Sequence, residues 1–215
     1  MSADTPNLLK LLTGREKKIS DVLGLSKQAE LDPIETPAPG EITQDTAEAQ
    51  KSGYPLSGKV LDLVNEQYNK EAFSSEIYYA LSAYFADLKL EGFACYFRKA
   101  AGEERCHAMK FFDYLIKCNI LIKPLPMEAP KAEFESPVAA CRFFLEHEQE
   151  VTRLINAIAD AAMTEKDFYT FEFIGWFLGE QLEEVRKAED LSKKVSFVED
   201  DRAGLLLLDQ ELKGN

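Results

Sequence analysis

The nine prolines of this 215-residue sequence fall in two regions, and their distribution limits the folds that the chain can adopt. Five lie at or before residue 55, and the other four lie between residues 124 and 137. Two long blocks, 56–123 and 138–215, therefore contain no proline. Because proline breaks the interior of a helix, both blocks are free to form long helices.

Each block contains one interruption of its apolar pattern. Gly92, which follows the sequence DLKLE, predicts a turn in the first block, and MTEKDF at 163–168 predicts one in the second. The periodicity then predicts four helices of roughly 26 to 32 residues and a short fifth. Their expected ranges are about 58–89, 93–118, 137–162, 167–195 and, for RAGLLLLDQEL, 202–212.

Four long helices of similar length are typical of a bundle. The connection between the second and third helices, 119–136, is too long and too rich in proline for a tight hairpin. We therefore expect it to cross the full length of the bundle. The predicted fold class is all-α, a four-helix bundle with this long crossover and a short fifth helix at the C-terminus.

Each long helix has an apolar stripe that a carboxylate interrupts near its midpoint. Residues spaced three and four apart define the stripes. The interrupting carboxylates are Glu71, Glu104, Glu148 and Glu184, and His107 follows Glu104 on the same face. Antiparallel packing of the helices would bring these midpoints to one level of the core.

Four ionised carboxylates at one level of a dry core would repel each other and would be costly to desolvate. Two divalent cations would offset about four negative charges, and carboxylate oxygens with imidazole suit iron or manganese. Zinc accepts the same ligand types, although so many carboxylates favour iron or manganese. The other histidine, His147, lies off the stripe, and we expect it beside the site or at the surface rather than on the metal.

Two further features near these positions each have two interpretations. Tyr78 lies two turns from Glu71 on the same face, either as a core tyrosine bonded to a carboxylate or as a redox-active neighbour. Glu103, Glu180 and Glu183 are each rotated by about 100° from a site position. They form either a solvated acidic face or a third, weaker cation site.

Composition excludes several classes of protein. The net charge of −13 and the pI near 4.7 argue against a nucleic-acid binder. The four cysteines include no CxxC pair, which is typical of reduced thiols in a cytoplasmic protein. No apolar run approaches the roughly 18–20 residues that span a bilayer, so we expect no transmembrane segment.

The sequence predicts two regions, an N-terminal extension over 1–54 and the bundle over 55–215. Residues 7–28 hold five Lys or Arg against two acids and favour a short amphipathic helix. Residues 29–50 hold six acids, no Lys or Arg and three prolines, as an extended linker does. The extension is either a docking segment for a partner or an unstructured tail.

From about residue 59 to residue 213, the chain resembles the bacterial-type non-haem ferritins, which store iron in hollow cages. Several motifs carry this resemblance, in the order that the family has them. They are LVNEQYNKEAFSSEIYYALSAYF, AGEERCHAMKFFDYL, EHEQEVTRLINAIADAAM, FLGEQLEEV and GLLLLDQEL. The resemblance implies a ferritin-like fold for the bundle.

The resemblance also implies two iron ions in each subunit. One would be bound by Glu71, Glu104 and His107. The other would be bound by Glu104, Glu148 and Glu184, so that Glu104 bridges the pair.

Other residues match the surroundings of that iron pair in the family. Glu103, Glu180 and Glu183 look like a third iron site, and Tyr78 matches a tyrosine near the pair. Gln181 would lie close by, in contact with dioxygen or a water. No haem is expected, because Arg105 occupies the place of the haem-ligating methionine of bacterioferritins.

The function implied is ferroxidation and iron storage, with Fe²⁺ and O₂ as substrates and a Fe³⁺ oxide-hydroxide mineral inside a cage of 24 identical subunits. Two alternatives use the same core. One is a di-iron oxidase or peroxidase of the rubrerythrin-like type, although rubrerythrins carry CxxC pairs. The other is a cage that its N-terminal extension recruits to a larger assembly.

Overall fold

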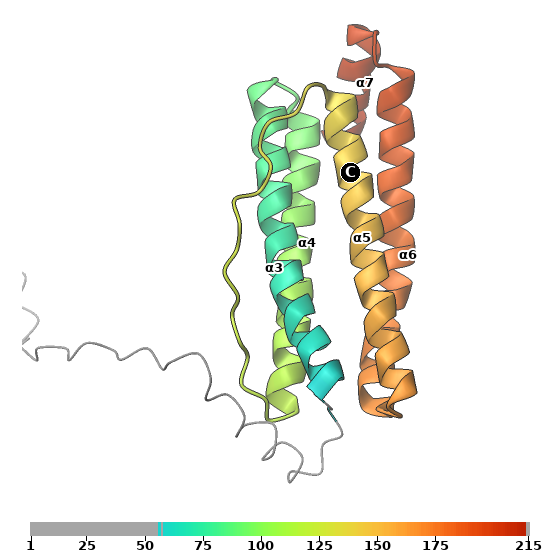
Figure 1. Ribbon diagram of the computed structural model, residues 1–215. Helices are drawn as coiled ribbons and strands as arrows, with labels where there is room; N and C mark the ends of the chain where they lie inside the picture. Colours follow the sequence, from blue (N-terminus) through green and yellow to red (C-terminus); the bar gives the residue numbers. More distant parts are fainter. Residues whose placement is uncertain (1–55, 57, 214–215) are drawn as a thin grey trace, which may run out of the picture. The chain divides into compact units, whose positions relative to one another are not determined.

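The computed structural model describes residue 56 and residues 58–213. In this part of the chain there are five helices and no strands, which confirms the predicted all-α class (Figure 1). The helices are α3 (Gly58–Asp87), α4 (Glu91–Lys117), α5 (Pro137–Thr164), α6 (Phe168–Phe197) and α7 (Arg202–Lys213). The predicted extension over 1–54, with its amphipathic helix and acidic linker, lies outside the described residues.

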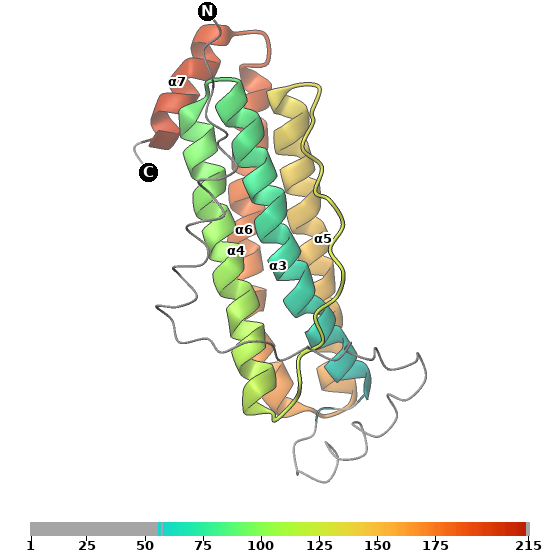
Figure 2. The same ribbon diagram turned by 90° about the vertical axis from the view of Figure 1, so that its left-hand side faces the viewer.

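The four long helices pair as two hairpins. Helix α3 packs against α4, α5 packs against α6, and α3 also contacts α5, which closes the bundle (Figures 1 and 2). None of the helices among the described residues is long and apolar enough to cross a membrane.

The connection between α4 and α5 runs lengthwise along the bundle, as the sequence predicts, and it lies on the outside of α3 (Figure 1). Near one end, the Asn65 side chain accepts a hydrogen bond from the Lys123 backbone N–H (2.8 Å) and donates to the Lys123 carbonyl oxygen (3.0 Å). Near the other end, the Phe134 ring packs edge-on against Tyr84, with 5.2 Å between ring centroids. Asn65 and Tyr84 are about 28 Å apart along α3 at 1.5 Å per residue, so the connection crosses most of the bundle.

The turns and caps show why the helices end where they do. The turn between α3 and α4 is made by Lys89, which has a φ of 62°, and not by Gly92 as the sequence predicted. Ser136 caps α5 by accepting a hydrogen bond from the Ala139 N–H (3.1 Å), and Asp167 caps α6 in the same way. Lys166, with a φ of 58°, reverses the chain between those two helices, within the predicted 163–168 turn.

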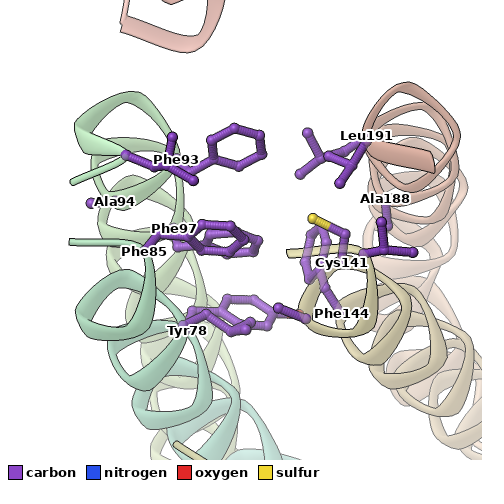
Figure 3. Close-up of a cluster of buried hydrophobic side chains, with 14 of the residues drawn as sticks. Tyr78, Phe85, Phe93, Ala94, Phe97, Cys141, Phe144, Ala188 and Leu191 are labelled. Carbon is purple, nitrogen blue, oxygen red and sulfur yellow. The ribbon is translucent and has the colours of Figure 1, made fainter. Parts of the chain in front are cut away.

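The core consists of two apolar clusters, one towards each end of the bundle. In the first, the Phe85 ring stacks on Phe93 and Phe97 at centroid distances of 4.7 and 5.3 Å, and the same cluster holds Phe144 and Leu191 (Figure 3). The second is built from the start of α3, the ends of α4 and α5 and the start of α6. Between the two clusters lies the level at which the four helices carry carboxylates.

The four cysteines are free, in agreement with the expectation of unpaired thiols. Cys118 and Cys141 are buried, whereas Cys95 and Cys106 are exposed.

Gly92 has a different role from the predicted one, because α7 docks on the first turn of α4. The Asp209 carboxylate accepts hydrogen bonds from the backbone N–H groups of Gly92 (2.6 Å) and Phe93 (3.1 Å). A Cβ at position 92 would lie 1.8 Å from the Asp209 carbonyl oxygen. Only glycine allows the two helices to approach this closely.

Gly92→Ala should therefore displace α7 and destabilise the bundle. The clash is with backbone rather than a flexible side chain, so we expect a loss of about 1–3 kcal/mol in the free energy of unfolding, as for other overpacked sites. Denaturant unfolding checks this, with Gly102→Ala as the matched control, because a Cβ at Gly102 meets nothing within 4 Å. Equal stability of the two variants would contradict the docking role of Gly92.

Candidate metal centre

The carboxylates that interrupt the four stripes are all buried. Glu71 lies on α3, Glu104 on α4, Glu148 on α5 and Glu184 on α6, and His107 lies one turn beyond Glu104. Their exposed fractions lie between 1% and 6%. Carboxylates are rarely buried this deeply unless they are paired or bind a metal.

One part of this level brings three candidate ligands together. Among the described residues, Glu71, Glu104 and His107 form the one group of three acidic, histidine or cysteine side chains whose ligand atoms all lie within 4.8 Å of one another. The His107 Nδ1 atom is 3.4 Å from Glu104 Oε2. The i,i+3 spacing on α4 makes this contact possible, because such residues share a helix face.

Glu71 has one satisfied and one unsatisfied oxygen. The Gln67 amide donates a 2.8 Å hydrogen bond to Glu71 Oε1 from one turn earlier on α3. Glu71 Oε2 is buried and has no hydrogen-bond partner. An unpaired carboxylate oxygen in a dry core is costly, and a cation between Glu71, Glu104 and His107 would satisfy it. The donor set therefore fits a divalent metal.

Hydrogen bonds from uncharged groups hold the carboxylate on α5. The Tyr78 hydroxyl donates to Glu148 Oε1, and the Gln181 amide donates to Glu148 Oε2 at 3.3 Å. Both donors are buried. The Tyr78 contact is the hydrogen bond to a carboxylate that its first interpretation expects, and a redox role for Tyr78 stays a prediction.

Glu184 is held differently, by an ion pair on its own helix. The Lys187 Nζ atom lies 2.7 Å from Glu184 Oε1. The Glu184 side chain is 8% exposed and that of Lys187 is 38% exposed, so the pair reaches from the core towards solvent.

Burial and mutual repulsion shift the protonation of these groups. Burial, followed by the charge of Glu104, raises the pKa of Glu71 well above its ordinary value. Burial also raises the pKa of Glu104 to about 8 and that of Glu148 to about 7. Burial and the neighbouring Glu148 charge raise the pKa of Tyr78 as well. Without metal, the centre therefore retains protons near neutral pH.

The expected second set of carboxylates is only partly brought together. Glu103 and Glu180 line a cavity of about 350 Å³ that reaches His107 between α4 and α6. Glu183 is exposed and does not line this cavity. The Trp176 and His107 rings form a T-shaped contact, with 5.6 Å between centroids.

Sequence reasoning did not assign roles to Gln67 and Lys187. Each lies one helical turn from a site carboxylate, at i−4 from Glu71 and at i+3 from Glu184, and that spacing was the available signal. His147 lies beside the site, as expected, where its Nε2 atom is 2.8 Å from the Ser74 hydroxyl oxygen.

Comparisons with known proteins agree on one family. Residues 61–198 match the family described as Ferritin-like domain. The bacterial non-heme ferritins of Escherichia coli O157:H7 and Staphylococcus haemolyticus are each 36% identical to this chain over 157 residues. Each alignment covers 73% of this chain and 95% of the relative.

Solved structures give the same result. An open pore ferritin from the archaeon Archaeoglobus fulgidus superimposes with a TM-score of 0.72 at 37% identity, covering 74% of this chain and 98% of that one. A structure described as a humanized archaeal ferritin has a TM-score of 0.72 at 38% identity, covering 74% and 97%.

The raised carboxyl pKa values predict how the stability of the metal-free protein depends on pH. Above about pH 5 the unfolded chain loses carboxyl protons that the folded chain retains up to pH 7 or 8, so the folded state binds more protons in this window. The free energy of unfolding should therefore fall as pH rises from about 5 to about 8. Thermal unfolding of chelator-treated protein across this range measures the effect.

Glu104→Gln provides the comparison for this experiment. The variant keeps the shape of the side chain but cannot ionise, so its stability should depend less on pH in the same window. A wild-type unfolding midpoint that is constant or rises between pH 5 and pH 8 would contradict the prediction.

Proposed function

Because the chain belongs to the ferritin family, we propose that it stores iron, oxidising Fe²⁺ with O₂ at a centre within each subunit and keeping Fe³⁺ as an oxide-hydroxide mineral inside a cage. The observation that carries this proposal is the buried, unpaired Glu71 Oε2 atom beside Glu104 and His107. A bundle whose core holds a buried carboxylate oxygen without a hydrogen-bond donor is suited to bind a cation there.

The two iron positions in this proposal are those that the family resemblance implies, and the cluster of Glu71, Glu104 and His107 supports the first of them. One Fe²⁺ binds Glu71, Glu104 and His107. A second binds Glu148 and Glu184 and shares Glu104, which is the bridging ligand. The proposal includes no haem, because Arg105 occupies the place of the haem-ligating methionine of bacterioferritins.

The protein contributes electrostatics and geometry to the oxidation. Each Fe²⁺ that is oxidised passes one electron towards O₂, and a site rich in carboxylates stabilises Fe³⁺ more than Fe²⁺ because the charge on the metal is larger. Binding of Fe²⁺ displaces the protons that Glu104 and Glu148 retain near neutral pH. Tyr78 and Gln181 fix the orientation of Glu148 through its two oxygens.

Storage requires a cage, and the surface of α7 supports one. Leu206 and Leu207 are 54% and 67% exposed on this short helix. Adjacent exposed leucines favour a contact between subunits. We propose a homo-oligomer of 24 copies, with the cavity beside Glu103 and Glu180 as the route by which Fe³⁺ leaves the pair site. Glu183, outside that cavity, is a further carboxylate for the departing ion. A cytoplasmic location belongs to the same proposal.

Glu104→Ala and His107→Ala should abolish rapid Fe²⁺ oxidation, because each removes a ligand of the first iron and Glu104 is shared by both. Stopped-flow absorbance after aerobic addition of two Fe²⁺ per subunit measures the rate. We expect a loss of at least about 100-fold, the size found when one group that stabilises developing charge is removed from other sites. Size-exclusion chromatography should show unchanged assembly.

Glu103→Ala is the matched control, because Glu103 is adjacent in sequence but exposed, and its first oxidation should keep the wild-type rate. Oxidation at the wild-type rate in Glu104→Ala would refute the assigned site. A wild-type dimer that consumes peroxide without retaining iron would favour the rubrerythrin-like alternative instead.

The two-region organisation, 1–54 and 55–215, remains part of this proposal. The family match begins at residue 61, and the curated relatives align over 157 residues. We therefore propose that the bundle alone assembles and oxidises iron, and that residues 1–54 are needed for neither.

A chain truncated to 55–215 should consequently form the same particle and oxidise Fe²⁺ at the rate of the full chain. Light scattering with size-exclusion chromatography measures the mass, and stopped-flow absorbance measures the rate. A truncated chain that does not assemble would show that the extension is part of the fold.

A further inference from the structure

The four buried carboxylates of the centre are compensated in four different ways. Glu71 accepts a hydrogen bond from the Gln67 amide, and Glu148 accepts hydrogen bonds from a phenol and an amide. Glu104 lies beside the His107 imidazole. Glu184 alone among them is paired with an alkyl ammonium cation, that of Lys187.

Lys187 is also the compensating group with the easiest path to solvent. Its side chain is 38% exposed, whereas Gln67, Tyr78 and Gln181 are buried. It lines the cavity between α4 and α6 that reaches His107 and holds Glu103 and Glu180. A lysine has a long flexible stem and a compact charge, so rotation about its bonds can carry the ammonium group from Glu184 into this cavity.

We propose that Lys187 is a displaceable internal cation, which occupies Glu184 in the metal-free protein and competes with the second iron for that carboxylate. This inference rests on the proposed function, because it assigns a regulator to the second iron position. The ammonium group supplies one positive charge to Glu184 when the metal is absent. A divalent ion that binds Glu184 must replace it.

The same exchange acts in both directions. When Fe²⁺ binds Glu148 and Glu184, Lys187 swings into the cavity, where Glu103 and Glu180 offer it other carboxylates. When Fe³⁺ leaves through the cavity, Lys187 returns to Glu184 and opposes rebinding of the product. Lys187 is thus a positioning residue that weakens binding of the second ion and speeds clearance of the site.

An anaerobic titration with Co²⁺ tests the first half of the proposal without any redox chemistry. The wild-type protein should bind two Co²⁺ per subunit at the centre, the second more weakly than the first. In Lys187→Met the second Co²⁺ should bind about three- to tenfold more tightly, as expected when one competing, partly exposed charge is removed. The affinity for the first Co²⁺ should not change. Visible absorption and calorimetry report both steps.

Sequential aerobic additions of Fe²⁺ test the second half. The first addition of two Fe²⁺ per subunit should be oxidised by Lys187→Met as fast as by the wild type. A second addition should be oxidised several-fold more slowly, because Fe³⁺ is retained on Glu184. Tighter binding together with slower repeated turnover separates this role from a general loss of structure.

Two further variants serve as controls. Lys99→Met makes the same change of charge in a residue that lines the same cavity, and it should behave like the wild type. Lys187→Arg keeps the charge and should retain the wild-type order of affinities. Lys187→Gln replaces Lys187→Met if the latter does not assemble.

The outcomes distinguish this proposal from the proposed function. If Glu104→Ala binds as much Co²⁺ as the wild type does, the metal is not at the assigned centre. The proposed function then fails, and the role of Lys187 fails with it. If the wild type binds two Co²⁺ but Lys187→Met has the same second affinity, only the Lys187 proposal is overturned. A lower unfolding temperature of Lys187→Met with unchanged Co²⁺ affinities would likewise overturn it, since that result describes a merely structural ion pair.

Discussion

The cost of removing carboxylates from water dominates this structure. Two apolar clusters fill the ends of the bundle, and between them four helices each place one glutamate at the same level. The apolar clusters stabilise the fold, whereas the polar level opposes it. A chain that needed only to fold would carry leucine at these positions, so the glutamates are best explained by a ligand that they bind.

The hydrogen bonds around the four buried carboxylates show how the metal-free protein offsets the cost of burying them. Amide and phenol groups satisfy some carboxylate oxygens, raised pKa values keep protons on Glu104 and Glu148, and a lysine neutralises Glu184. Glu71 Oε2 has no hydrogen-bond donor, and the raised pKa of Glu71 lets a retained proton take the place of a cation there. The centre is therefore partly prepared for a cation and partly strained without one, which favours uptake of Fe²⁺ by a rigid scaffold.

Periodicity predicted the fold well because a four-helix bundle repeats one rule over long segments. The level of the carboxylates followed from the same rule, since each interruption fell near the middle of its helix. The i+3 spacing of Lys187 from Glu184 allowed their contact but did not establish it, because a lysine on a partly exposed face has many rotamers and only packing selects one. The prediction of a turn at Gly92 was wrong for a similar reason. Its constraint comes from Asp209, more than a hundred residues later, and no local pattern contains that contact.

The docking of α7 links two distant parts of each subunit mechanically. Asp209 holds the first turn of α4, and Glu104 lies twelve residues further along that same helix, about 18 Å away. A helix is stiff over this length, so a force on α7 tilts the whole of α4 and thereby moves the segment that carries Glu104. Neighbouring subunits that contact α7 would thereby restrain the metal centre from outside. The rigidity of the centre would then be a property of the assembled particle.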